Sequence, residues 1–122
     1  EESRSQHENR ARALKRLRQA FFLKLRKTVS DLDGVSDRAE LKAIRTVAGK
    51  FEVGRKDVRF WPAAGLVLDV LEATEARVSE SANALAVSTG SLIDFLETEP
   101  KVWAEVNHLR TRFGHKPLKT GD

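Results

Sequence analysis

Apolar residues recur at spacings of three and four along most of this sequence, which is the period of one face of an α-helix. The pattern is clear near the N-terminus, where one line of apolar positions comprises Leu14, Leu17, Phe21, Leu25 and Val29. Ser5 followed by Glu8 is a capping-box pattern, in which each side chain binds a free backbone N–H of the first turn. We therefore predict a helix from about Gln6 to about Val29, ended by Asp31, Asp33 and Gly34.

Two further helices are predicted before the middle of the chain. The first starts after Ser36 or Asp37 and ends at Gly54, with an inward stripe of Leu41, Ile44, Val47, Ala48 and Phe51. The second covers roughly residues 62–74, because Pro62 suits a first helical turn, where its missing N–H has no partner anyway. Its residues are apolar nearly all round, which predicts the buried centre of the fold.

The last third of the chain predicts three short helices. Residues 79–86 and 88–97 resemble a helix-turn-helix pair, with Ala86 where the turn glycine is usual. Pro100 opens a final helix, whose inward residues are Val102, Trp103, Val106, Leu109 and Phe113, and Gly114 follows its end. No strand-like alternation of useful length is present, so the predicted fold is all-α. It comprises a basic helix over residues 1–30, a linker near residues 30–36 and a helical domain over residues 36–118 with the helix-turn-helix-like unit at about 79–97.

Charge divides the chain more sharply than its net charge of +4 indicates. Residues 1–27 carry nine Lys and Arg against three Glu, a net charge of +6. Residues 60–106 carry two basic and eight acidic side chains, a net charge of −6. This asymmetry favours a basic end that meets an anionic partner and an acidic unit that does not.

Several functional classes lack their signatures. There is no cysteine, and the three histidines, His7, His108 and His115, lie far apart without a zinc-binding spacing. No phosphate-binding glycine loop or nucleophile elbow is present. We expect no catalytic residue, metal or cofactor in this chain. No run of about 18 apolar residues predicts a membrane span, and the absence of cysteine favours a cytoplasmic location. The absence of methionine leads us to expect a portion of a longer product.

One segment carries a family resemblance. The run Arg4-Ser5-Gln6-His7-Glu8-Asn9, followed by a basic helix, resembles the end of the catalytic domain of bacterial class I peptide chain release factors and of release-factor-like ribosome-rescue proteins. Ser5, Gln6, His7 and Asn9 match the family residue by residue, and the resemblance covers about residues 1–27. It implies a translation termination or ribosome-rescue protein that binds the ribosome, through ribosomal RNA or tRNA.

The family hydrolyses peptidyl-tRNA with a Gly-Gly-Gln loop, which this chain lacks because none of its seven glycines are adjacent. The resemblance therefore implies the C-terminal portion of such a protein, with hydrolysis in a portion outside this chain. The family segment suggests RNA contact by Arg4, Gln6, His7 and Asn9. The charge of the helix independently suggests phosphate contact by Arg12, Lys15, Arg16 and Arg26. The acidic helical unit is expected to dock on a protein.

Two other functions remain open. One is a small helix-turn-helix regulator that binds DNA through residues 79–97. Its second helix carries Asp94 and Glu97, with Glu99 just beyond, and these carboxylates repel phosphate instead of binding base edges. The other is a helical interaction module that binds no nucleic acid.

Overall fold

The computed structural model describes the backbone of residues 2–119 and the side chains of residues 5–119. Within these residues the fold is all-α, as the sequence predicts, and the only β-type pairing is an isolated antiparallel bridge between Arg45 and Phe51. The elements in chain order are α1 (Glu2–Lys24), the 3₁₀ turn η1 (Val35–Asp37), α2 (Ala39–Lys42), α3 (Phe60–Ala73), α4 (Val78–Leu85), α5 (Thr89–Glu97) and α6 (Pro100–Arg112).

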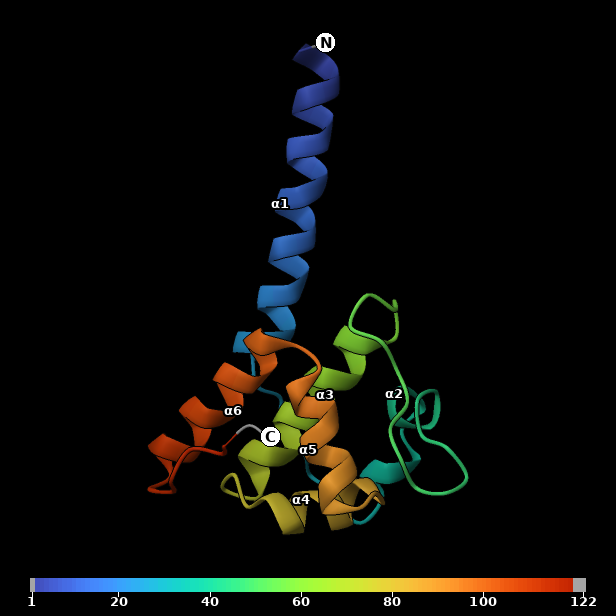
Figure 1. The fold of residues 1–122 in the computed structure, drawn as a ribbon, viewed down its shortest axis with the longest axis vertical. Helices are drawn as coiled ribbons and strands as arrows, with labels where there is room; N and C mark the ends of the chain where they lie inside the picture. The colour runs from blue at the N-terminus through green and yellow to red at the C-terminus, as the bar shows by residue number, and fades with distance from the viewer. Residues whose placement is uncertain (1, 120–122) are drawn as a thin grey trace.

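Helix α1 projects from a compact body made by the other helices (Figure 1). Only the C-terminal end of α1 packs on that body, against α3 and α6. Every described side chain from residue 5 to residue 18 is exposed, whereas Leu23 near the end of α1 is buried. The N-terminal end of α1 therefore lies far from the hydrophobic core.

Helix α3 is the centre of the body. Every residue from Phe60 to Val70 is buried except Pro62, which is half-buried. The ten buried residues are apolar or glycine, apart from the carboxylate Asp69. Helices α1, α2, α4 and α6 all pack against it. A helix that is apolar on all sides has to be covered on all sides, and this confirms the central place that the sequence predicts. Pro62 lies in the first turn of α3.

The helix-turn-helix-like pair is confirmed as a local geometry. Ala86 ends α4 in the left-handed region at φ 61°, and the N–H of Val87 donates to the carbonyl of Ala82 at 3.0 Å. Ser88 caps α5, since its hydroxyl accepts from the N–H of Ser91 at 3.1 Å. Gly114 has a φ of 83° just after α6, as expected for the residue that ends that helix.

The first helix has different limits from those predicted. It starts at Glu2, so Ser5 lies inside the helix and the capping-box prediction is wrong. It ends at Lys24 instead of about Val29. The early end has a tertiary cause, because Asp69 of α3 accepts a hydrogen bond from the backbone N–H of Lys27 at 3.1 Å and one from the Arg26 side chain at 3.0 Å. These hydrogen bonds hold residues 26 and 27 against α3, where they do not continue the helix.

The helix predicted from Ser36 or Asp37 to Gly54 is largely absent. Only η1 and the four-residue α2 form, and residues 44–52 make a tight loop instead. In this loop the N–H of Glu52 donates to the carbonyl of Ile44 at 2.7 Å, and Gly49 has a φ of 79°. Leu41 and Ile44 are buried as predicted, but Val47 and Ala48 are fully exposed. The glycine and the β-branched residues Thr46 and Val47 weaken the helix here.

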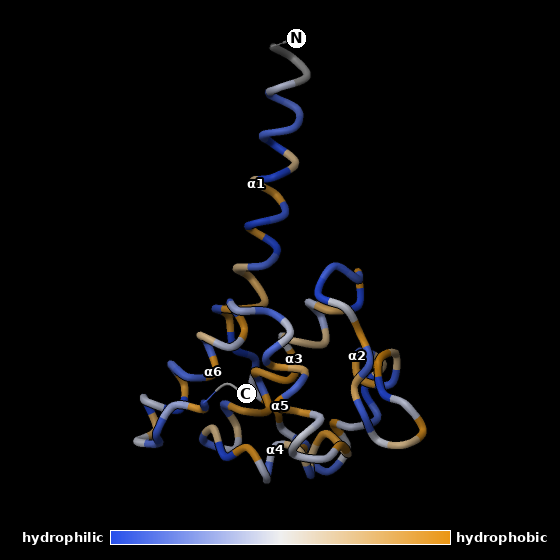
Figure 2. Tube along the Cα trace, viewed as in Figure 1, coloured by the Kyte–Doolittle hydropathy of each residue, from blue (hydrophilic) through white to orange (hydrophobic). Residues whose placement is uncertain are grey.

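Most of the apolar line that begins on α1 is exposed, although Val29 packs against the core. Figure 2 shows hydrophobic positions on the projecting part of α1, between hydrophilic ones. The exposed fractions along the line are 62% for Leu14, 68% for Leu17, 44% for Phe21 and 57% for Leu25. The body instead contacts Phe22 and Leu23, which lie on a different face of the helix.

Candidate nucleic-acid interface

The basic side chains of α1 stand on its projecting part. Arg12, Lys15 and Arg16 share one face of the helix, because residues three and four apart are neighbours on a helical surface. All three are exposed, and within residues 5–119 none of them has an ion pair or a side-chain hydrogen bond. Cations that no carboxylate neutralises inside the fold remain available to an anion from outside.

The residues of the family-like segment divide between two faces of α1. Asn9 shares its face with Arg12 and Arg16, at spacings of three and seven residues. His7 lies seven residues before Leu14, on the exposed apolar line, and Gln6 falls near the same side. All of these side chains are exposed at the projecting end of the helix (Figure 1). The side chain of Arg4 lies outside the described residues.

Arg26 has a structural role in the fold. Its guanidinium forms an ion pair with Asp69 at 3.0 Å and donates to the carbonyls of Phe22 and Leu23 at the end of α1. The Arg26 side chain is only 15% exposed. Burial raises the pKa of Asp69, and the Lys27 N–H and the Arg26 charge act in the opposite direction. Arg26 thus joins α1 to α3, and we leave it out of the proposed binding face.

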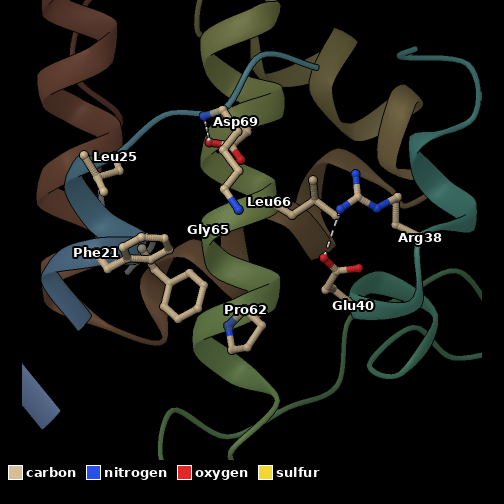
Figure 3. Close-up of a pocket in the computed structure, with 10 residues that line it drawn as sticks. Phe21, Leu25, Arg38, Glu40, Pro62, Gly65, Leu66 and Asp69 are labelled. Atoms are coloured by element: carbon tan, nitrogen blue, oxygen red, sulfur yellow. Dashed lines mark hydrogen bonds and ion pairs between the residues drawn. The ribbon is translucent and has the colours of Figure 1, made fainter. Parts of the chain in front are cut away.

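The joint between α1 and α3 contains a small crevice of about 60 Å³, which Figure 3 shows in close-up. Phe21 of α1 and Leu25 just after that helix lie on one side of it, and Gly65 and Leu66 of α3 lie on the other. Its walls also include Arg38 and Glu40, which form an ion pair with each other at 3.1 Å. The crevice is small, and the charges of Arg38 and Glu40 in its wall are paired with each other. We therefore assign it to the packing of α1 and not to ligand binding.

Three cations near the basic face were missed by the sequence analysis. Arg18 lies one turn beyond Lys15 on α1, with its guanidinium 5.4 Å from the centre of the Phe22 ring. Arg55 and Lys56 belong to the loop before α3 and line the same surface hollow as Lys15 and Arg18. The adjacent cations Arg55 and Lys56 are visible in the sequence, but their proximity to α1 depends on the fold.

The helix-turn-helix-like unit presents few groups suited to DNA. The exposed residues of α5 are Thr89, Gly90 and Asp94, and no basic residue occurs in that helix. Phe95 and Leu96 face the core instead, at 3% and 0% exposure. The surface that would enter a major groove is therefore uncharged or acidic, opposite to what phosphate requires.

The described residues contain no group of three or more His, Cys, Asp or Glu side chains that could hold a metal ion. None of the helices in this part of the chain is long and apolar enough to cross a membrane. Comparison of the chain with models of protein families, with curated proteins and with solved structures gave no match.

Proposed function

We propose that this chain binds ribosomal RNA or tRNA through the basic face of α1, as part of a release-factor-like protein of translation termination or ribosome rescue. The observation that supports this most directly is the projecting helix with Arg12, Lys15 and Arg16 exposed on one face and unpaired within the described residues. A partner that neutralises these cations gains free energy from the release of counterions condensed on its phosphates.

The choice of RNA rests on the family-like segment. Ser5, Gln6, His7 and Asn9 match the release-factor pattern and lie on the projecting end of α1, where a large partner could reach them. Asn9 stands beside Arg12 and Arg16, so this family-like residue and the cations form one continuous surface, whereas His7 lies on the exposed apolar line. In this proposal the cytoplasmic protein carries its Gly-Gly-Gln loop outside this chain, and this chain supplies binding without hydrolysis.

The helical body has a different part in the proposal. Its acidic residues include the exposed Asp94 on α5, a helix of the body from which the tip of α1 points away (Figure 1). The basic tip and the acidic stretch of residues 60–106 orient the molecule on a polyanion, because phosphate repels the acidic stretch. The body would then dock on protein, and a DNA-binding role for α5 is disfavoured by the same charges.

The test measures the salt dependence of binding to a tRNA transcript and to duplex DNA of similar mass. Replacing Arg12, Lys15 and Arg16 together by Ala should weaken tRNA binding. It should also flatten the plot of log affinity against log salt by roughly two to three units, at about 0.7 to 0.9 per lost contact. The matched control replaces Lys42, Lys50 and Lys116, three exposed lysines of the body, and should leave the slope unchanged.

Two results would contradict the proposal. An unchanged slope in the α1 triple variant would place binding elsewhere on the chain. Tighter binding to duplex DNA than to tRNA at equal salt, lost on Asp94→Ala but retained in the α1 variant, would favour the helix-turn-helix regulator instead. Circular dichroism of both triple variants checks that the fold is retained.

A further inference from the structure

A second wall of positive charge stands beside the basic face of α1. The loop of residues 54–59 carries Arg55 and Lys56, and these two side chains line an open hollow together with Lys15 and Arg18 of α1. We call these four residues the basic corner. The hollow measures about 300 Å³, and its other walls include Gln19, Asp57, Val58, Trp61 and Glu99.

The loop is held in place by its own hydrogen bonds. Asp57 accepts from the Arg59 side chain at 2.7 Å and from the Arg59 backbone N–H at 2.9 Å. Arg59 also donates to the carbonyl of Ala43 at 2.9 Å, which ties the loop to the preceding segment. Arg55 and Lys56 therefore stand on a preorganised turn, and a ligand would pay little entropy to order the backbone beneath them.

The opposite wall is also fixed. The Lys101 ammonium donates to the Gln19 side chain at 3.2 Å, and Lys24 forms an ion pair with Glu105 at 2.8 Å. Both contacts join α1 to α6 just below the corner, so the direction of α1 relative to the loop is set by the body. Lys15 belongs both to this wall and to the proposed RNA-binding face, which makes the two surfaces continuous.

The charges of the corner are not balanced by the acids near it. Asp57 is already paired with Arg59, whose hydrogen bonds lower the pKa of that carboxyl to about 2. Glu99 caps α6 by accepting from the N–H of Lys101 at 2.9 Å. Within residues 5–119, Lys15, Arg55 and Lys56 have no ion pair or side-chain hydrogen bond. Four cations around one hollow therefore outweigh the single charge of Glu99 and favour an anion between them.

The lining of the hollow indicates which part of a nucleic acid fits it. Bases are commonly held by stacking on exposed aromatic rings, but the one aromatic side chain here, Trp61, is only 5% exposed. Apart from Val58, the exposed side chains of the lining end in ammonium and guanidinium ions, which bind phosphate oxygens.

We infer that the basic corner seats the sugar–phosphate backbone of the RNA bound by α1, and does so without selecting base sequence. This inference rests on the proposed function. The RNA-binding surface is then two-walled, with α1 as one wall and the 54–59 loop as the other.

The test replaces Arg55 and Lys56 together by Ala in the full chain. Both side chains are exposed and contribute nothing to the core, so thermal unfolding should stay as in the parent chain. Binding to the tRNA transcript should weaken, and the salt slope should fall by roughly 1.4 to 1.8 units for two lost contacts. The loss should be equal for oligouridine and oligoadenosine. The control of equal charge, Lys42→Ala with Lys50→Ala, should behave as the parent chain.

The outcomes separate this inference from the proposed function. If the loop variant matches its control while the α1 triple variant still loses affinity, the inference is wrong and the proposed function stands. If the loop variant loses affinity for only one of the two homopolymers, the corner binds bases, and the backbone assignment is overturned. If the parent chain binds none of these RNAs in a salt-dependent way, both proposals fail together.

Discussion

Asp57 is a single surface carboxylate whose charge holds the loop that carries Arg55 and Lys56. Its hydrogen bonds from Arg59 lower its pKa from the ordinary value of 3.8 to about 2. A carboxyl group whose pKa is lower in the folded state than in the unfolded state stabilises the fold when it is ionised. This stabilisation is present at pH values above the unfolded-state pKa and is lost as the pH falls through the folded-state pKa. The Asp57 contribution should therefore be complete above about pH 5, fall as pH drops through the unfolded and then the folded pKa, and vanish only near about pH 1.

We predict that Asp57→Asn lowers the free energy of unfolding near neutral pH and that the difference from the parent chain has lost most of its size at about pH 2. Urea unfolding at a series of pH values measures this difference. Asp33→Asn, which removes an equal charge at an exposed aspartate elsewhere on the surface, is the reference variant. A difference that stays constant from pH 7 to pH 2 would show that Asp57 acts without its charge.

The attachment of α1 depends on a close approach between two helices. Gly65 of α3 faces Phe22 of α1, and a Cβ at position 65 would lie 2.8 Å from the Phe22 ring. That distance is shorter than any normal carbon contact, so a side chain here has to push α1 away from α3. Excess volume in a packed joint typically costs about 1–3 kcal/mol.

We predict that Gly65→Ala is less stable than Gly90→Ala by about 1–3 kcal/mol. The two substitutions are chemically identical and both lie in helices, but a Cβ at Gly90 meets nothing within 4 Å. The comparison therefore removes the gain in helix propensity that Ala brings at either site. Thermal and urea unfolding of the two variants give the difference, and equal stabilities would mean that Phe22 moves aside at no cost.

The three-dimensional core is held together by an aromatic cluster that joins distant segments. Phe95 of α5 stacks on Phe60 of α3 with ring centres 5.2 Å apart, and it contacts Phe51 of the 44–52 loop at 5.3 Å. Phe95 is separated by tens of positions in the sequence from both Phe51 and Phe60, so the cluster forms only in the folded chain. Aromatic pairs in this geometry add to the free energy of ordinary burial.

We predict that Phe95→Ala lowers the stability of the entire body by about 3–5 kcal/mol. Asp94→Ala, the neighbouring exposed position, should change stability by less than about 0.5 kcal/mol. Both variants are measured by urea unfolding. If Phe95→Ala unfolds at the same urea concentration as the parent chain, the contacts of the aromatic cluster between α3, α5 and the loop do not contribute to the free energy of unfolding.

The spacing of apolar residues was sufficient to predict the helices that are buried in the body of the protein. The apolar character of roughly residues 62–74 predicted the central helix, with Pro62 in its first turn, and Pro100 and Gly114 marked the two ends of the last helix, as the structure confirms. These signals are local, because they depend on the preferences of one segment for a helical turn. The charge of the first 27 residues is also a property of the sequence, and it alone pointed to an anionic partner.

Tertiary contacts decided the rest. Asp69 ended α1 by binding Arg26 and Lys27, and an apolar line that sequence periodicity alone would bury was left exposed. The same contact turned Arg26 from a candidate RNA ligand into part of the joint between α1 and α3. Arg55 and Lys56 came to stand beside Lys15 only through folding. Local patterns specify which residues favour a helix, whereas which surfaces meet depends on the free energy of packing the entire chain.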